Sequence, residues 1–335
     1  MIAVSAFRDR IPGIIAIVFM AVGGASAACT NALPIIAPTL QAQLPGDRLD
    51  LSWTNDGVRW ILETTQDLGR PAVWSPLAAT NRQFSAPLDS TNSRSFFRLH
   101  LPPPRGRISA DSFNVMQPIV LPGDIVYASA NRDPSPGGPQ WNELKFEQAT
   151  QALASVTNLQ VGKTITFSSV DDLQAKLPLL APDINWVSYD SESGMTPTNE
   201  LANLTNSVPQ FAQLAHNLGR KAGWGPTDNI LQSNEDTYLA LAGVLDNFAL
   251  QHQKVLANQG INAFVNVTTN RAARIYTANP QCGVLVQVVI GLGSTNDLIN
   301  GLTSVAPFVT DLSVFTTTNT ATAIQIYDAV RGCWP

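Results

Sequence analysis

The spacing of hydrophobic and polar positions changes near residue 107. Beyond that point, apolar runs of strand length alternate with longer segments whose apolar residues recur every three or four positions. Continuous apolar strands alternating with amphipathic helices predict a parallel sheet that is covered by helices. We expect strands at 125–129, 164–168, 184–189, 221–225, 247–250, 284–290 and 312–315, and helices at 141–156, 170–180, 198–218, 235–244, 255–276, 296–306 and 321–330.

Residues 108–335 are predicted to form an α/β domain, a (β/α) TIM-like barrel. A chain of this length in repeated βα units favours a barrel over an open doubly wound sheet. No G-x-G-x-x-G fingerprint follows the first expected strand, which disfavours nucleotide binding. A complete barrel has eight strands. Either one strand is irregular and lies within 112–120, or the barrel has seven strands.

Residues 30–101 show a different pattern, with short period-two strands separated by turn residues. Leu49–Trp53 alternates, Trp60–Glu63 follows, and Ser95–Leu99 ends the set, which predicts a small antiparallel β-sandwich. The set also resembles a β-sandwich module of secreted bacterial multidomain proteins, at Trp53, Leu62, Glu63, Trp74 and 96–99. The resemblance implies a spacer or an attachment domain for a cell surface, without catalysis. The prolines of 102–107 predict a stiff linker to the barrel.

The first 27 residues have the features of a secretory signal peptide. Arg8 and Arg10 form a positive region, an apolar stretch covers 11–24, and Ala25-Ser26-Ala27 is a small-residue cleavage site. The apolar stretch is too short for a transmembrane helix. We therefore expect a secreted, extracellular or periplasmic protein.

Composition narrows the classes of function. Only 13% of the residues are charged and the net charge is −5, which argues against a nucleic-acid partner. The three histidines and three cysteines lie apart, without zinc-ligand spacing, so we expect no metal and no cofactor. In an oxidising compartment, Cys282 and Cys333 are expected to form a disulfide that joins the last helix to the barrel wall.

The stretch NWVSYDSESG, residues 185–194, carries the clearest candidate chemistry. It starts as a buried strand and ends with Asp190 and Glu192, at the strand end where barrel active sites form. By alternation these acids share one face with Trp186 and Ser188 and lie ~6–7 Å apart. Such a pair suits glycoside hydrolysis, which needs one protonated and one ionised carboxyl group. Close carboxylates also push their pKa values apart. A solvated loop or a helix cap is the alternative interpretation.

The same strand resembles that of family 18 chitinase-like barrels, whose motif is D-x-x-D-x-D-x-E. Aligned on Glu192, this chain has Asn185, Ser188 and Asp190, so the last two acids match and the first two do not. The resemblance implies that Glu192 protonates the glycosidic oxygen and that Asp190 orients an N-acetyl group or stabilises the cation it forms. Residues 180–320 also resemble secreted TIM barrels related to glycoside hydrolases.

Other strand ends provide groups that suit sugar binding. Glycines flank Trp224, whose ring we expect to stack on a pyranose face. The amides of Asn247, Gln251, Gln253 and Gln287 are candidates for binding hydroxyl groups, and interior polar packing is their alternative use. Trp186 is a further candidate substrate contact. Less favoured are Asp228 and Asp246 as second carboxylates, and the turn at 291–295 as a phosphate site rather than a tight strand-to-helix connection.

Two functions remain open. The first is a secreted glycosidase that cleaves a polysaccharide or oligosaccharide, with Glu192 and Asp190 as the catalytic acids. The retained pair of acids favours it. The second is a non-catalytic carbohydrate-binding or surface protein on a degenerate barrel. The two missing aspartates of the motif favour that alternative.

Overall fold

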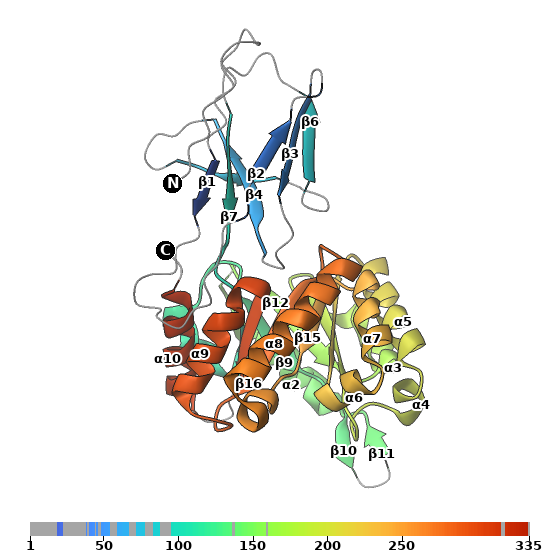
Figure 1. Cartoon of the computed structure of the whole chain (residues 1–335). Coiled ribbons are helices and arrows are strands. Elements are labelled where there is room, and N and C mark those ends of the chain that lie inside the picture. Colours follow the sequence, from blue (N-terminus) through green and yellow to red (C-terminus); the bar gives the residue numbers. More distant parts are fainter. Residues whose placement is uncertain are drawn as a thin grey trace, which may run out of the picture. The chain divides into compact units, whose positions relative to one another are not determined.

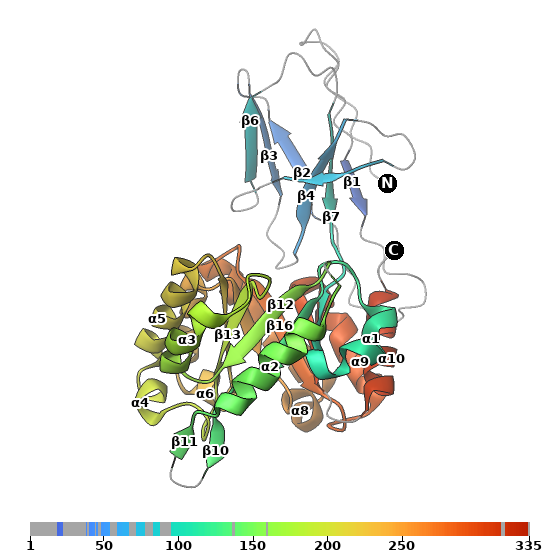
Figure 2. The same ribbon diagram turned by 180° about the vertical axis from the view of Figure 1, so that it is seen from behind.

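The computed structural model describes residues 19–22, 38, 40–43, 45, 48–53, 59–66, 72–77, 83–87, 95–135, 138–158, 160–315 and 319–333. They fall into two compact units. One unit consists of residues 1–103 together with 332–335, and the other is Pro104–Arg331. Figure 1 and Figure 2 show the chain from opposite sides. Among the described residues, no helix is long and apolar enough to cross a membrane.

The larger unit is a TIM-like barrel, as the sequence predicts. Eight parallel strands close the ring in the spatial order β12-β13-β14-β15-β16-β17-β8-β9. The strands are β8 (Arg105–Ser109), β9 (Ile125–Ser129), β12 (Gly162–Phe167), β13 (Trp186–Ser191), β14 (Lys221–Pro226), β15 (Asn247–Leu250), β16 (Gly283–Val289) and β17 (Asp311–Phe315). All seven strands expected between 125 and 315 are present within three residues of the expected bounds.

Helices surround this ring (Figure 1). They are α1 (Phe113–Met116), α2 (Glu143–Ser155), α3 (Val170–Lys176), α4 (Thr198–Leu201), α5 (Leu204–Asn217), α6 (Asp228–Ser233), α7 (Glu235–Ala240), α8 (Val255–Ala278), α9 (Thr295–Val305) and α10 (Thr320–Arg331). Short 3-10 turns are η1 (Ala110–Ser112), η2 (Gln117–Ile119), η3 (Leu177–Leu179), η4 (Leu241–Val244) and η5 (Ala306–Phe308). The apolar faces of the long helices cover the outer surface of the strands; for example, Phe211 of α5 stacks on Tyr189 of β13. A hairpin of β10 (Asp133–Ser135) and β11 (Gly138–Gln140) follows β9.

The eighth strand lies where the sequence predicted a linker. Arg105, Gly106 and Arg107 belong to β8, which pairs with β17 on one side and β9 on the other. The hydrophobic pattern did not reveal this strand, because two of its five residues are arginines. Their side chains face the barrel interior, where Asp311 partly neutralises their charge. The expected irregular strand within 112–120 is wrong, since this segment contains α1 and η2. Consequently, β13 is the fourth barrel strand and not the third.

The smaller unit contains small β-sheets. One sheet has the order β1-β7-β4-β5, with β1 (Phe19–Val22), β4 (Ile61–Thr65), β5 (Ser75–Pro76) and β7 (Phe96–His100). The other has the order β2-β3-β6, with β2 (Leu40–Gln43), β3 (Arg48–Trp53) and β6 (Gln83–Pro87). Leu51, Leu62 and Leu99 are buried at the alternate positions that the period-two pattern predicted. Apart from β1, the predicted signal peptide lies outside the described residues, and it remains a prediction.

The expected disulfide between Cys282 and Cys333 is wrong. Cys282 is a free thiol, buried immediately before β16. Cys333 is disulfide-bonded, but not to Cys282, and its contacts place it with residues 1–103 rather than with the barrel. Spacing along the chain could not reveal this, because a disulfide requires two Cα atoms within about 7 Å, which only the fold decides.

Candidate functional site

The strand register determines which side chains fill the barrel interior. In a TIM barrel, alternate strands contribute the four residues of each interior layer. A layer near the amino ends of the strands contains Ile125, Trp186, Asn247 and Asp311. Four further layers lie above it, toward the carboxyl ends of the strands. The first two are Arg107, Thr164, Gly223 and Leu285, and then Tyr127, Ser188, Ala249 and Ser313. The last two are Ser109, Thr166, Gly225 and Gln287, and then, at the mouth, Ser129, Asp190, Gln251 and Phe315.

Small side chains in the upper layers leave the barrel hollow above the layer of Trp186. TIM-barrel interiors are normally filled by branched apolar residues. Here, Ser188, Ala249, Ser313 and Gly225 occupy such positions and line a cavity of about 360 Å³. The cavity begins at the mouth formed by the strand ends and reaches down to Arg107. The candidate site is therefore a deep cavity within the barrel.

Asp190, at the carboxyl end of β13, is held in this cavity by two amides. Asn131 donates from Nδ2 to one carboxylate oxygen, and Gln251 donates from Nε2 to the other, both at 2.8 Å. Burial raises the pKa of Asp190 above its ordinary value, while the two amide hydrogen bonds act in the opposite direction. The side chain is thus oriented on both oxygens before any ligand binds.

Glu192 lines the same cavity two residues further along the chain. Its backbone N–H donates to Thr196 Oγ1 at 3.1 Å, and Thr196 Oγ1 donates to the carbonyl of Asp190, which fixes the turn after β13. Burial raises the pKa of Glu192, and the negative charge of Asp190 raises it further. The structure therefore brings the two predicted acids to one cavity, and both have raised pKa values.

Several cavity residues were not foreseen from the sequence. Arg107, Tyr127, Asn131, Thr164 and Ser313 all contribute to the lining. The sequence could have identified Asn131 as a candidate, because it follows the expected strand at 125–129 and so lies at the same edge of the barrel as Asp190. The others lie within strands, where only the register shows that they face inward.

Three of these residues present buried polar atoms that have no hydrogen-bond partner in the described part of the chain. They are Oδ1 of Asn131, Oγ1 of Thr164 and Nε of Arg107. Leaving a buried polar group unsatisfied costs about 1–3 kcal/mol.

Trp224 does not form a sugar-stacking surface as predicted. It is fully buried on the outer side of β14, where its ring packs edge-on against Tyr238 and Phe248. Its indole N–H donates to Ser191 Oγ at 2.8 Å. The flanking glycines, Gly223 and Gly225, occupy the inward positions, so they widen the cavity and do not expose the ring.

Gly225 serves the site in another way. A Cβ atom there would lie 3.3 Å from the Ala249 Cβ and 3.4 Å from the Gln251 amide nitrogen. Its absence lets the Gln251 amide bond both the Gly225 carbonyl and Asp190.

Trp186 and Asn247 face inward but belong to the layer below Arg107, outside the cavity lining. The Trp186 ring lies between two cations, with the Arg107 guanidinium carbon 5.4 Å and the Lys221 Nζ 4.8 Å from its centroid. Asn247 donates to Asp311 Oδ2 at 2.8 Å. Neither residue is therefore placed to contact a ligand in the cavity.

The remaining candidates separate clearly. Gln251, Gln253 and Gln287 line the cavity. Asp228 instead pairs with Arg271, and Asp246 pairs with His216 and accepts from the Ala222 N–H. The contacts of these two acids are therefore structural, and neither acid lines the cavity.

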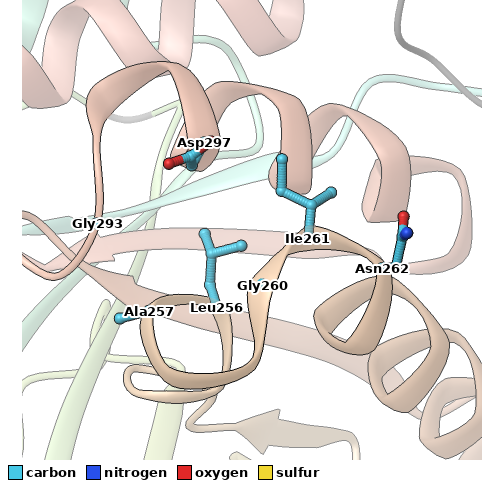
Figure 3. A pocket seen from close by; sticks show the side chains of 7 residues that line it. All are labelled: Leu256, Ala257, Gly260, Ile261, Asn262, Gly293 and Asp297. Atoms are coloured by element: carbon cyan, nitrogen blue, oxygen red, sulfur yellow. The ribbon is translucent and has the colours of Figure 1, made fainter.

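A second cavity of about 440 Å³ lies between α8 and α9 (Figure 3). Its lining is Leu256, Ala257, Gly260, Ile261, Asn262, Gly293 and Asp297. Gly260 has φ +79° and interrupts α8, and Gly293 has φ +91° in the turn before α9. Leu256 and Ile261 extend from α8 toward α9, which carries Asp297 (Figure 3).

The turn at 291–295 is built as a strand-to-helix connection. Ser294 Oγ accepts from the Asp297 N–H at 3.1 Å and donates to the Asp297 carboxylate at 2.8 Å. This carboxylate already complements the helix N-terminus, so a phosphate there would meet a like charge. The phosphate interpretation of this turn therefore has no support from the geometry.

Comparison with known proteins gives structural neighbours only. No protein-family model matches the chain, and no curated protein matches it in sequence. The catalytic domain of a family 18 chitinase from the fern Peteris ryukyuensis aligns with a TM-score of 0.48 and 16% identity, covering 68% of this chain and 98% of that one. A citrate lyase from Burkholderia xenovorans aligns with a TM-score of 0.42 and 11% identity, covering 68% and 77%.

Proposed function

We propose that this protein is a glycoside-hydrolase-like enzyme that acts on a saccharide in the barrel cavity. The observation that carries the proposal is the pair Asp190 and Glu192, which face one cavity at the carboxyl end of β13 and have raised pKa values. Glycosidases require two carboxyl groups in different protonation states on either side of the bond to be cleaved.

The surroundings of the two acids favour different roles. Asp190 accepts two amide hydrogen bonds, which stabilise its ionised form. Glu192 has a raised pKa partly because Asp190 is charged, so it is the better proton donor. Glu192 would protonate the glycosidic oxygen as the bond to C1 breaks, and Asp190 would stabilise the positive charge that develops on the sugar. Water then adds to C1, and the proton that it loses returns to Glu192.

The amide and hydroxyl groups of the lining suit a neutral, hydroxyl-rich substrate backbone. Gln253, Gln287, Thr166 and Ser129 offer donors and acceptors around the mouth and upper layers. Such groups bind sugar hydroxyls without adding charge, while Gln251 and Asn131 are already engaged with Asp190. A signal peptide at 1–27 and a β-sandwich attachment module at 30–101 would place this activity outside the cell, and both belong to the proposal.

The experiment is a panel of polysaccharides and oligosaccharides assayed for reducing ends, comparing the parent protein with Glu192→Gln and Asp190→Asn. We expect each variant to lose at least 100-fold in turnover, since general acid catalysis contributes 10²–10⁴-fold. Glu147→Gln is the matched control, because Glu147 is exposed on α2 and does not line the cavity. Turnover that persists in Glu192→Gln would reject the assignment.

A non-catalytic saccharide-binding protein is the second candidate. It is favoured by Ser188, which faces the cavity where the family 18 motif has an aspartate, so that Asp190 lacks a neighbouring inward carboxylate on β13. Binding of saccharides by the parent protein with no turnover on any member of the panel would support this function over the enzyme.

A further inference from the structure

Arg107 forms the closed end of the cavity. Its side chain is 6% exposed and lines the cavity one layer above Trp186. The Trp186 ring supports the guanidinium from below, with 5.4 Å between the guanidinium carbon and the ring centroid. This cation–π contact uses none of the guanidinium N–H groups as hydrogen-bond donors.

The charge of Arg107 is only partly neutralised. Asp311 accepts hydrogen bonds from Arg105 at 2.6 and 3.1 Å, from Asn247 at 2.8 Å and from Thr310 at 3.1 Å. The distance from Arg107 Nη2 to Asp311 Oδ2 is 3.6 Å, which is too long for a good hydrogen bond. One carboxylate thus faces two guanidinium groups, and one positive charge remains at the end of the cavity.

Hydroxyl groups surround this charge. Thr164 lies in the same layer as Arg107, and Tyr127, Ser188 and Ser313 form the next layer toward the mouth. Oγ1 of Thr164 is buried and, within the described ranges, without a partner, as is Nε of Arg107. Burial raises the pKa of Tyr127 to about 12, so its hydroxyl stays protonated and can donate. A cation among hydroxyl donors is a binding site for an anion.

We propose that the cavity binds the terminal residue of an acidic saccharide, a uronic acid, with its carboxylate on Arg107. The inference rests on the proposed function, because it assigns the glycosidic bond of that residue to Asp190 and Glu192. The layers of Arg107 and Asp190 are about 8 Å apart along the barrel axis, from a rise of ~3.3 Å per residue and a strand tilt of ~36°. One sugar residue spans this depth.

The closed lower end also favours a chain terminus over a chain interior. Trp186, Asn247, Asp311 and Ile125 fill the layer beneath Arg107, so a polymer cannot pass through the barrel. The charges of the cavity, Arg107 below and the acids Asp190 and Glu192 above, would orient a sugar acid with its carboxylate inward. Lys145, the other cation of the lining, is paired with Asp133. A sugar that enters the other way would place its carboxylate beside Asp190 and be repelled.

The test is calorimetric titration of the full chain with D-glucuronate and D-galacturonate, compared with D-glucose and D-galactose. We expect at least one uronate to bind tenfold or more tightly than its neutral counterpart. Arg107→Met should abolish this preference. Arg274→Met removes the same charge from α8, where Arg274 pairs with Glu235 and Asp236 outside the cavity, and it should retain the preference.

Arg107→Met could also disturb folding, because Arg107 helps to balance Asp311. Circular dichroism checks this, and Thr164→Val provides a second variant, which removes a hydroxyl that bonds no described residue and should weaken uronate binding severalfold. D-glucose 6-sulfate tests the anion: a sulfate that binds as tightly as the uronates would overturn the assignment of a carboxylate. Equal binding of acidic and neutral sugars, or a preference that survives in Arg107→Met, would overturn the inference as a whole.

The test of uronate binding can fail or succeed independently of the test of hydrolysis. Monosaccharides contain no bond to cleave, so their binding is measured without turnover and can be repeated in Glu192→Gln. If neutral saccharides are bound and cleaved, the acidic class is wrong while the hydrolase stands. If uronates bind through Arg107 but no linked saccharide is cleaved, the inference holds for a binding protein and the hydrolase is rejected.

Discussion

The Gln251 amide bridges two neighbouring strand ends by donating from Nε2 to Asp190 Oδ1 and to the Gly225 carbonyl, each at 2.8 Å. Gln251 follows β15, Asp190 ends β13, and Gly225 belongs to the strand between them. The orientation of the central carboxylate therefore depends on three consecutive strands of the barrel. Asn131, which follows β9, secures its other oxygen.

Removing this amide should change the titration of Asp190. Burial raises the pKa of Asp190, and the hydrogen bonds from Asn131 and Gln251 counteract that rise because they stabilise the ionised form. In Gln251→Leu we expect the pKa to rise further. Carbon-13 NMR of labelled aspartate side chains would follow the midpoint. Gln253→Leu is the control, since Gln253 lines the cavity without a hydrogen bond to Asp190. An unchanged or lower midpoint in Gln251→Leu would contradict the assigned role.

Replacing Trp224 should affect stability and leave ligand binding unchanged. Trp224 is fully buried beneath the helices, and its indole N–H is bonded to Ser191. Trp224→Ala removes a large core side chain and should cost about 3–5 kcal/mol in the free energy of unfolding. Trp224→Phe, which keeps an aromatic ring, should cost less. Urea unfolding measures both, and saccharide affinity in Trp224→Phe should stay within twofold of the parent protein. A large loss of affinity with unchanged stability would restore Trp224 as a ligand contact.

Asp311 should stabilise the fold in a pH-dependent way. Its pKa is lowered, because the attraction of Arg105 and Arg107 outweighs the effect of burial. A carboxyl group whose pKa is lower in the folded state stabilises the protein above its unfolded pKa, and this contribution is lost as the pH falls through the folded pKa. Asp311→Asn should therefore cost about 3–5 kcal/mol at pH 7, since it leaves the buried Arg107 and the partly exposed Arg105 without their carboxylate, and progressively less in acid.

Denaturant unfolding between pH 2 and 7 tests this dependence. Asp236→Asn is the matched control, because Asp236 is 94% exposed and pairs with the partly exposed Arg274 of α8. An exposed pair is expected to contribute about 1 kcal/mol or less. A cost for Asp311→Asn that stays constant with pH would show that the charge of Asp311 is not responsible.

Cys282 should react only when the barrel unfolds. The thiol is 1% exposed, and burial together with the charges of Asp246 and Asp311 raises its pKa far above the ordinary value. Reactivity requires an accessible thiolate, so both factors protect it. Iodoacetamide labelling followed by peptide mass spectrometry should modify the Cys282 peptide in 6 M guanidinium chloride and leave it unmodified in the native protein. Labelling in the native state would show that the start of β16 opens.

The sequence by itself determined the βα rhythm, the seven barrel strands from 125 onward and the position of the two acids at a strand end. These features depend on local hydrophobic spacing, which a single chain segment expresses on its own. It also identified Gln251, Gln253 and Gln287 as polar groups at neighbouring strands. Alternation grouped Asp190 with Ser188 on one face, but the register with neighbouring strands was needed to show that this face points inward.

Only the tertiary structure decided the remaining features. Strand β8 was concealed by Arg105 and Arg107, whose inward charges are tolerated because Asp311 arrives from the other end of the sequence to lie beside them. Trp224 was assigned to the wrong face, since which of two alternating faces points inward is set by register with neighbouring strands. The hollow interior above Arg107 likewise depends on segments that meet only after the barrel has closed. The distances between such segments are set when the barrel closes, and the hydrophobic spacing within one segment does not determine them.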